Sequence, residues 1–592
     1  MEILIDRVRI TNYRAIKDLE LTLSPFTILV GANNSGKTTF LRALHLALGE
    51  GRKSISKEDF HIDNTKVADE IIIDVRIIPV DKENKRLQEF DEVWFPGLFI
   101  ESQIQYDKNE MAYVSFRTRI KPDERKSGGY SIERTILSEW DESKDYPNKK
   151  IETNTLTRFE PIPLYFVDAQ RDILQDIRDK NSFFGRLVAQ INFDEKKVKE
   201  LEKLLANLNQ EIINNSPVLR HLSERLAELN ETIGTKNSNI EITPVHKKIR
   251  DIGRGLNIHL KEQHLESLPL DYHGIGTRSW ASLLALKAFI SWSILVSKKN
   301  EEPFHPILAL EEPESHLHPN AQRHLISQLV KMEGQKIVST HSPFIVATCP
   351  LSSIRHFYKT ENGIKIGMPG KLLSPKEMKK IEREIINTRG ELLFAKCIVL
   401  CEGSTEEQML PIFAKKKWEQ SSFELGICFA GTGGGTNYKS FITFCRSLNI
   451  PWFILGDSEP KIVSVLNKHL SDLQLQSYDK YDNIILIPNG ENIEQYLINQ
   501  GYQQELKIAI FEAEKENCKN KNHAKAKEKE IQEYNDTQIL DYLKNNKTKL
   551  ATYIAEAIVT CGVETRRIPD VFQKLFDKIQ KEIGVNKQEV NE

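Results

Sequence analysis

The chain has 592 residues, of which 40% are hydrophobic and 28% charged, and its formal net charge is −2. This composition is typical of a soluble globular protein with several buried cores. The net charge gives no sign that nucleic acid is a partner, but it does not exclude a local basic groove. At roughly 100–200 residues per domain, the length predicts three or four units. We find no signal sequence and no apolar run of roughly 18 residues. The seven scattered cysteines indicate reduced thiols, so we expect a cytoplasmic protein without a membrane span.

Residues 1–50 are predicted to form two strands, a loop and a helix. Their start, MEILIDRVRITNYRAIKDLEL, alternates apolar and polar residues as a half-buried strand does. A short buried strand is expected over Phe26–Val30, and an apolar helix over Thr38–Leu48. Further strand-like runs fall in residues 70–120 and near 163–169.

Residues 180–265 differ in character from the segments on either side. Leucines recur there at helical spacing in two runs, and the stretch Asn214–Pro217 between the runs is suited to a turn. We therefore predict an inserted helical hairpin, which is either an amphipathic surface pair or a short dimerisation arm. The leucines of the two runs are Leu201, Leu204, Leu205 and Leu208, and Leu219, Leu222, Leu226 and Leu229.

An α/β pattern resumes after the insertion and starts again near Lys396. Residues 300–350 are expected to form strand, loop, helix and strand, and residues 351–390 form a link of mixed charge. Buried strands are then predicted for AKCIVL, PWFILGD and NIILIPN, with a helix from about Glu406. Alternating strands and helices favour a second parallel sheet, so the predicted fold class is α/β throughout.

A phosphate-binding motif lies between the first buried strand and its helix. The sequence GANNSGKT matches the pattern G-x-x-x-x-G-K-[ST] in full. Glycines let backbone N–H groups surround phosphates, Lys37 reaches the β and γ phosphates, and the Thr38 hydroxyl binds Mg²⁺. We therefore predict ATP binding. The nucleotide-binding residues expected from this loop are Gly31, Asn33, Asn34, Ser35, Gly36, Lys37, Thr38 and Thr39.

A strand that ends in two carboxylates supports this prediction. The segment Ile307–Pro319 reads ILALEEPESHLHP, in which four apolar residues precede the acidic pair. We expect Glu311 to contribute to the Mg²⁺ shell and Glu312 to orient the attacking water. Without the upstream loop, the segment would be read as a strand followed by an acidic turn.

Further positions resemble those of ATPases of the ABC and SMC type. His341, in IVSTHSP, follows a strand where those proteins place a γ-phosphate sensor. The resemblance implies nucleotide contacts for Arg14 in TNYRAIKD and for Gln170 in VDAQRD. It also implies a signature loop with Gly276 and Ser279 in GIGTRSWASL, although the usual SGG core is absent. Because such a loop contacts the ATP of another subunit, the resemblance implies a homodimer.

A second acidic set follows the strands of the C-terminal part. The carboxyl ends of parallel strands meet in one crevice, so acidic residues placed there are expected to converge. Oxygen clusters of this kind select Mg²⁺ or Mn²⁺. The alternative is a set of acidic turns that cap helices. The residues of this set are Glu402, Glu406, Asp457, Glu459, Glu491 and Glu494.

The acidic pattern resembles a Toprim domain, as in topoisomerases, primases and certain nucleases. A Toprim domain has a glutamate after its first strand and a DxD motif after a later one. Here the second motif is a DxE, Asp457-Ser458-Glu459. An ABC-type ATPase followed by EGSTEE and DSE resembles the OLD (overcoming lysogenisation defect) family of ATP-dependent nucleases. That family includes the nuclease subunit of the Gabija system and retron-associated effectors, and the resemblance covers nearly the whole chain.

The resemblance to the OLD family implies a catalytic set. Its metal ligands would be Glu402, Glu406, Asp457, Glu459 and Glu494. A late lysine would assist at the scissile phosphate, for which Lys547 is favoured over Lys549. Two metal ions would then hydrolyse the phosphodiester, and the lysine would neutralise charge that develops on the phosphate.

The domain organisation follows from these motifs. Residues 1–180 and 266–390 would form an ABC/SMC-type P-loop ATPase domain, interrupted by a helical, dimerising insertion over 181–265. Residues 391–592 would form a Toprim nuclease domain.

We therefore expect an enzyme: an ATP-regulated, Mg²⁺- or Mn²⁺-dependent DNA endonuclease that nicks DNA or cuts both strands, with a role in defence against phage. Its implied partners are DNA, a second copy or a higher homo-oligomer, and a helicase or a reverse transcriptase with its RNA–DNA product. One alternative is an ATP-dependent DNA clamp or scaffold with a degenerate Toprim domain, which the DxE departure leaves open. A topoisomerase-like enzyme would need a nucleophilic tyrosine such as Tyr438, Tyr496 or Tyr553.

Overall fold

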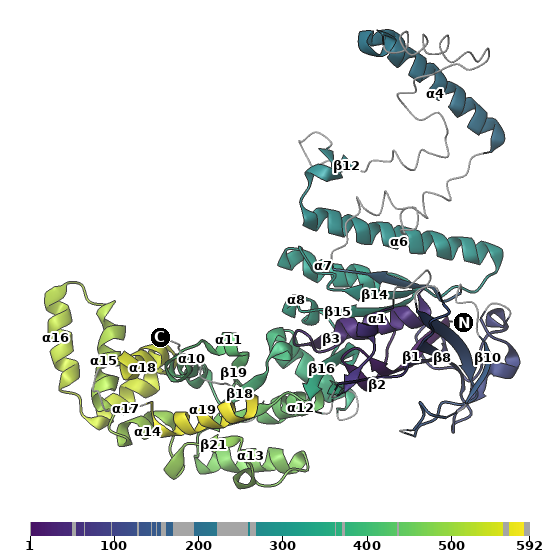
Figure 1. Cartoon of the computed structure of the whole chain (residues 1–592). Helices are drawn as coiled ribbons and strands as arrows, with labels where there is room; N and C mark the ends of the chain where they lie inside the picture. The colour runs from purple at the N-terminus through teal and green to yellow at the C-terminus, as the bar shows by residue number, and fades with distance from the viewer. Residues whose placement is uncertain are drawn as a thin grey trace.

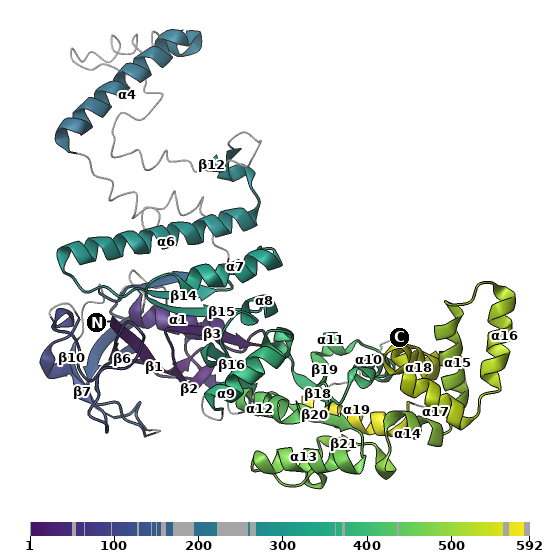
Figure 2. The same ribbon diagram turned by 180° about the vertical axis from the view of Figure 1, so that it is seen from behind.

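The computed structural model contains two α/β bodies. Figure 1 shows one body built from the N-terminal and central segments and another from the C-terminal segments, while α4 (Glu195–Asn215) stands apart from both. The reverse view in Figure 2 shows the same arrangement. The α/β class is thereby confirmed. The structure describes residues 2–49, 55–63, 65–95, 98–126, 129–143, 145–149, 151–155, 161–169, 194–221, 259–260, 268–361, 363–369, 373–434, 437–560 and 568–584.

The first sheet is antiparallel and begins the N-terminal body. Its strand order is β10-β9-β8-β6-β1-β2, with β7 pairing to β8. The central strand β6 is buried at every position, and its two charged side chains are paired: Asp74 with Arg117 at 2.8 Å, and Arg76 with Asp6. The strands are β1 (Glu2–Tyr13), β2 (Ile16–Thr22), β6 (Ile71–Val80), β7 (Gln105–Tyr106), β8 (Ala112–Pro122), β9 (Tyr130–Leu137) and β10 (Glu152–Thr155). A separate pair is formed by β4 (Ile62–Asp63) and β5 (Lys66–Val67).

The second sheet carries the phosphate-binding loop. Its order is β11-β14-β15-β3-β16-β17, and its pairs are parallel except for β16 with β17. The predicted strand at Phe26–Val30 is β3, the run near 163–169 is β11, and the predicted helix is α1. The elements are β3 (Phe26–Gly31), α1 (Lys37–Leu48), β11 (Leu164–Val167), β14 (Ile307–Glu311), β15 (Gln335–Ser339), β16 (Ile354–Thr360) and β17 (Gly363–Gly367).

Alternate residues of β3 pack into two different cores, because successive side chains of a strand point to opposite faces of the sheet. Leu29 packs with α1 and the antiparallel sheet. Ile28 and Val30 pack on the opposite face with three helices, α6 (Ile275–Asn300), α7 (Pro319–Val330) and α8 (Pro343–Val346). The phosphate-binding loop is therefore held by a strand that is buried on both faces.

Among the described residues, α6 alone is long and apolar enough to cross a membrane by length and composition. Leu286, Phe289 and Ile290 of this helix are buried in the core of the first body. A core helix meets the same criterion, so the helix is weak support for a membrane span.

The predicted helical insertion is described only in part. Asp194 caps the start of α4, its side chain accepting a hydrogen bond from Lys197 N at 2.8 Å. The side chains of Leu204 and Leu208 are 57% and 49% exposed. The predicted second helix lies mostly outside the described residues, and dimerisation through this segment stays a prediction. After it, β12 (His259–Leu260) pairs with β13 (Leu268–Pro269).

The C-terminal body is built on a four-stranded parallel sheet with the order β19-β18-β20-β21. Its strands are β18 (Cys397–Cys401), β19 (Ile427–Gly431), β20 (Trp452–Gly456) and β21 (Ile484–Leu486). The helices near the sheet are α10 (Ser404–Trp418), α11 (Ser422–Leu425), α12 (Tyr438–Leu448), α13 (Pro460–Asp472), α14 (Ile493–Asn499), α18 (Lys547–Thr560) and α19 (Asp570–Ile583). The outer helices are α15 (Gln503–Lys515), α16 (Lys521–Gln532) and α17 (Asp536–Asn545).

The two bodies share a continuous core. His356 of β16 and the carbonyl oxygen of Leu448 in α12 are hydrogen-bonded through Nδ1 at 2.8 Å. A methyl group on Gly367 of β17 would lie 2.6 Å from the Leu448 backbone. The connection runs through α9 (Pro375–Ile381), a single π-helical stretch (Glu382–Ile386) and a 3₁₀ turn (Gly390–Phe394) whose Leu392 and Leu393 are buried.

Candidate functional site

The phosphate-binding loop requires glycine at two positions. Gly31 has a φ of 137°, and a side chain there would collide with the carbonyl oxygen of Phe357. Gly36 has a φ of 103°, and a methyl group on it would lie 2.5 Å from Ile364. Only glycine adopts these left-handed conformations without strain, so the loop cannot be rebuilt with larger residues.

The side chain of Lys37 is hydrogen-bonded to the backbone of its own loop. Its Nζ donates hydrogen bonds to the carbonyl oxygens of Gly31 and Ala32, each at 2.9 Å. Burial lowers the pKa of Lys37 to about 8. An anionic phosphate at this position would stabilise the charged form of the ammonium group and replace its carbonyl partners.

The ends of β14 and β15 bring the predicted acidic and sensor residues to the same loop. The Thr38 hydroxyl donates a hydrogen bond to Glu311. Glu312 follows with a φ of 43°, and its Oε1 lies 3.8 Å from Nε2 of His341. These residues converge from three elements that are separated in sequence, as the ATPase prediction requires.

Glu314 was missed by the sequence analysis. Its Oε1 accepts hydrogen bonds from the Thr340 hydroxyl at 2.6 Å and from the backbone N–H of His341 at 2.9 Å. Burial raises the pKa of this carboxyl group. Glu314 therefore holds the His341 loop beside the β14 end, and its place in the same acidic turn was the available signal.

The remaining ATPase candidates lie in different settings. Arg14 bonds to Asp59 at 2.7 Å. Ser279 is fully buried in α6, and a side chain on Gly276 would collide with the carbonyl oxygen of His316, so both face their own body. Their contact with a second subunit stays a prediction, and Gln170 lies outside the described residues. In the loop itself Asn33 and Asn34 are exposed, Ser35 is buried and Thr39 is half-buried.

The C-terminal body gathers carboxylates at the carboxyl edge of its sheet. Glu402 follows β18, Asp457 follows β20, and Glu406 and Glu494 lie on α10 and α14. Nζ of Lys547, the first residue of α18, lies 2.9 Å from Oε1 of Glu494. These five residues form what we call the carboxylate cluster.

Repulsion within the carboxylate cluster perturbs its acids. Burial and then the charges of Glu402, Glu406 and Glu494 raise the pKa of Asp457 to about 8. Burial likewise raises the pKa of Glu402 and of Glu406. A bound cation would remove the repulsion between these acids and favour the charged form of each.

The other C-terminal candidates are placed less centrally. Glu459 is exposed at the start of α13, although its charge acts on Glu402. Lys549 extends toward α15, where its Nζ lies 3.9 Å from Glu514. Glu491 bonds to Asn499 at 2.7 Å. Of the two late lysines, the structure brings Lys547 to the cluster.

The donor atoms fit a hard divalent cation. Among the described residues, no three His, Cys, Asp or Glu side chains converge closely enough to hold a metal ion in the present conformation. However, Oε2 of Glu402 and Oδ1 of Asp457 are buried without a hydrogen-bond partner in that part of the chain. All donors are oxygens, which Mg²⁺ and Mn²⁺ prefer.

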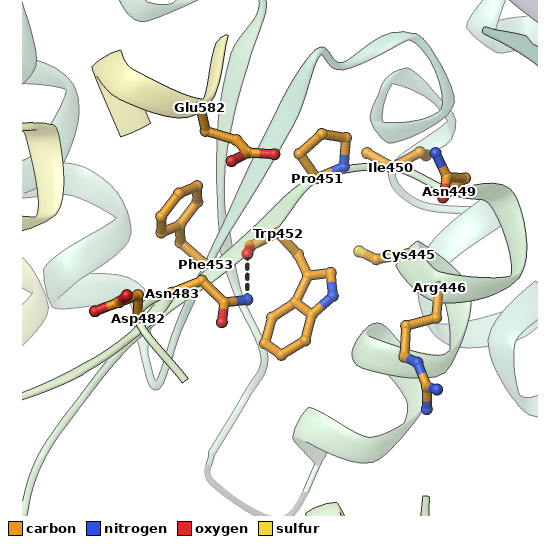
Figure 3. Close-up of a pocket in the computed structure, with 10 residues that line it drawn as sticks. All are labelled: Cys445, Arg446, Asn449, Ile450, Pro451, Trp452, Phe453, Asp482, Asn483 and Glu582. Carbon is orange, nitrogen blue, oxygen red and sulfur yellow. Dashed lines mark hydrogen bonds between the residues drawn. The ribbon is translucent and has the colours of Figure 1, made fainter. Parts of the chain in front are cut away.

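A separate pocket lies at the opposite edge of the same sheet. Its volume is about 530 Å³, and Trp452, the first residue of β20, lies in its wall. Figure 3 shows Asn483 bonded to the Trp452 backbone, with Glu582 and Arg446 on either side. Because Asp457 follows the other end of β20, this pocket is not part of the carboxylate cluster.

Two of the three tyrosines considered as nucleophiles are buried, and the third is paired with a glutamate. Tyr438 and Tyr496 are 1% and 2% exposed. The hydroxyl of Tyr553 lies 3.4 Å from Glu516 in the outer helices.

Comparison with protein families matches both bodies. The family described as AAA ATPase domain matches residues 4–346, and the family described as Overcoming lysogenization defect protein-like, TOPRIM domain matches residues 393–458. The second match ends before Glu459, Glu494 and Lys547.

Named relatives cover most of the chain. The "OLD nuclease" of Thermus scotoductus (strain ATCC 700910 / SA-01) is 24% identical over 77% of this chain and 82% of that protein. The "Endonuclease GajA" of Bacillus cereus (strain HuB5-5) is 20% identical over 83% of this chain and 81% of its own length. The "Old nuclease" of Escherichia phage P2 is 23% identical over 79% of each chain.

Solved structures match each body separately. The C-terminal region of the Xanthomonas campestris pv. campestris OLD protein matches 32% of this chain and 97% of its own, with 18% identity and a TM-score of 0.26. An Smc head bound to the C-winged helix domain of ScpA matches 63% and 99%, with 17% identity and a TM-score of 0.35. Both scores are low, and the assignment rests on the sequence matches. The chain belongs to the AAA ATPase domain family and joins this ATPase to an OLD-like Toprim domain, the organisation of the OLD nucleases.

Proposed function

We propose that this chain is a DNA endonuclease that hydrolyses phosphodiester bonds with Mg²⁺ or Mn²⁺ and is regulated by ATP. The observation that carries the proposal is the carboxylate cluster: three acids with raised pKa values lie at one edge of a parallel sheet together with the ion pair of Glu494 and Lys547. The names of the relatives, nuclease and endonuclease, agree with this reaction.

Each member of the cluster has a role in the proposed reaction. Glu402, Glu406, Asp457 and Glu494 would hold the divalent ions, which when bound activate a water and stabilise the leaving oxygen. Lys547 would contact the scissile phosphate and offset the negative charge that develops there. Glu406 is oriented for this task by the backbone N–H of Gly403, which donates to its Oε2 at 3.0 Å.

Nucleotide binding is assigned to the loop from Gly31 to Thr39. ATP would lie with its phosphates at Lys37 and its Mg²⁺ near Thr38 and Glu311, and Glu312 would orient the attacking water. Completion of the site by a second copy, through Gly276 and Ser279, belongs to the same proposal.

The coupling of ATP to cleavage is supported by a chain of contacts between the bodies. The ring of His341 lies 6.3 Å from that of Phe394, in the connecting 3₁₀ turn. A methyl group on Gly390 in the same turn would lie 2.7 Å from the carbonyl oxygen of Pro343. The preceding Arg389 pairs with Glu407 on α10 at 3.1 Å. Because Glu407 adjoins Glu406, a displacement of the His341 loop would reach the carboxylate cluster.

Plasmid cleavage tests the proposal. Wild-type protein and Glu402→Ala are incubated with supercoiled DNA and Mg²⁺ or Mn²⁺, with and without ATP. We expect nicking or linearisation by the wild type only, with a rate that changes when ATP is added. Equal cleavage by Glu402→Ala would refute the site, and ATP-dependent DNA binding without any cleavage would identify a clamp instead.

A role in phage defence extends the proposal through the resemblance to the Gabija nuclease subunit. Phage should form fewer plaques on cells that express the wild-type chain, alone or with its genomic neighbours, than on cells that express Glu402→Ala. Equal plaque numbers in both would remove the defence role and leave the nuclease proposal intact.

A further inference from the structure

A buried tyrosine hydroxyl near the carboxylate cluster has no hydrogen-bond partner among the residues that the structure describes. Tyr438 is the first residue of α12, and its ring is part of the core that joins the two bodies. Its side chain is 1% exposed, and among the residues that the structure describes its hydroxyl makes no hydrogen bond. Buried hydroxyl groups in native proteins nearly always have a partner, so this one requires an explanation.

Gly456 determines how close this hydroxyl comes to the cluster. A methyl group on Gly456, the last residue of β20, would lie 3.0 Å from the hydroxyl oxygen of Tyr438. The hydroxyl therefore reaches the backbone immediately before Asp457. Burial, followed by the charge of Glu402, holds the pKa of Tyr438 well above its ordinary value. The phenol accordingly keeps its proton and offers a hydrogen-bond donor to a group of acids.

Glu402, one acid of the carboxylate cluster, has a carboxylate oxygen that could accept this hydrogen bond. Glu402 follows β18 at the same edge of the sheet as Asp457. Its carboxylate oxygen Oε2 is buried and has no hydrogen-bond partner among the described residues. Within the described part of the chain, an unpaired donor and an unpaired acceptor thus both lie near the carboxyl edge of the sheet.

We propose that Tyr438 is a positioning residue of the nuclease site: its hydroxyl donates a hydrogen bond to Glu402 and orients that carboxylate for a divalent cation. The inference rests on the proposed function, and it adds a residue that none of the recognised motifs contains. Partners of this kind fix the orientation of a ligand, and their removal lowers metal affinity or activity by roughly 10–100-fold. Tyr438 does not act as a nucleophile, because its burial keeps it from a DNA strand.

The test is Mn²⁺ binding to the nucleotide-free full-length chain, measured by isothermal titration calorimetry. Tyr438→Phe removes the hydroxyl and keeps the ring, so its melting temperature should stay near that of the wild type. We expect its Mn²⁺ affinity to fall by roughly tenfold or more. At limiting Mn²⁺, kcat for plasmid cleavage should fall while KM for DNA stays unchanged.

A second variant and a control separate positioning from packing. Gly456→Ala keeps the tyrosine but displaces its hydroxyl, and it should weaken Mn²⁺ binding in the same direction. Tyr496→Phe is the control, because Tyr496 is also buried in this body and its hydroxyl lies 3.4 Å from Val571 N instead. It should bind Mn²⁺ as the wild type does.

Three outcomes would overturn the inference. The first is unchanged Mn²⁺ affinity in both Tyr438→Phe and Gly456→Ala, while the wild type binds and cleaves. The second is an equal loss in Tyr496→Phe, which would indicate a general effect on the domain. The third is a wild type that neither binds Mn²⁺ nor cleaves DNA, which would refute the proposed function itself and this inference with it.

Discussion

The ion pair between Lys547 and Glu494 provides a quantitative test of the carboxylate cluster. The two groups are 2.9 Å apart, and the Glu494 side chain is 4% exposed whereas that of Lys547 is 44% exposed. Breaking a fully buried pair costs about 3–5 kcal/mol. Solvent around Lys547 screens part of this energy, so we expect Lys547→Met to destabilise the C-terminal body by about 1–3 kcal/mol. For a unit of this size, that lowers the melting temperature by roughly 2–12 °C.

The assay is differential scanning calorimetry of the metal-free full-length chain. Lys549→Met is the matched control, because the Lys549 side chain is 49% exposed and its Nζ lies 3.9 Å from Glu514. A surface change of this kind should alter stability by less than about 0.5 kcal/mol. Adding Glu494→Gln to Lys547→Met should recover part of the lost stability, since the buried carboxylate that had lost its partner is then replaced by a neutral amide.

Two results would refute this reasoning. One is a melting temperature for Lys547→Met that equals that of Lys549→Met. The other is a double variant in which the two losses simply add, because the groups would then not interact.

The contacts and charges described above lead to four further predictions. Lys37→Ala should abolish ATP binding in a fluorescent-nucleotide titration, because the ammonium group that meets the phosphates is gone; retained binding would contradict the loop assignment. Arg389→Ala should leave ATP binding intact but make cleavage insensitive to ATP, whereas Arg383→Ala, an exposed arginine of the same segment that pairs with its neighbour, should behave as wild type. The pKa of Asp457 is raised to about 8, so a cation that binds there below this pH must displace a proton. The affinity for Mn²⁺ should therefore rise about tenfold per pH unit from pH 6 to 8 and then level off. The raised folded-state pKa also means that the metal-free domain loses stability as pH rises toward 8, a loss that calorimetry of Asp457→Asn should not show.

Local sequence was sufficient for the elements whose chemistry is local. The phosphate-binding loop, the β14 strand with its acidic end and the strand before Glu402 are each encoded within about a dozen residues, since turn geometry and strand burial depend on neighbours in the chain. The α/β class, the two kinds of domain and the family resemblance came from the order of such segments.

Other features depended on contacts between distant segments. Sequence spacing could not separate Lys547 from Lys549 because both lie in one helical turn, and only the packing of α18 against α10 and α15 directs the first to Glu494 and the second to Glu514. The pairing of Arg389 with Glu407 likewise has no sequence signature.

Tyr438 illustrates the same division most clearly. By sequence alone it was one of three tyrosines without a motif. The role proposed for it depends on its burial near the carboxyl end of β20, where Gly456 leaves room for its hydroxyl. Sequence thus determined which chemical groups this protein carries and which short structures hold them. The tertiary structure decided which of those groups share a buried, poorly solvated space, because charge and hydrogen-bonding energies depend on distance and solvent exposure, and sequence spacing specifies neither.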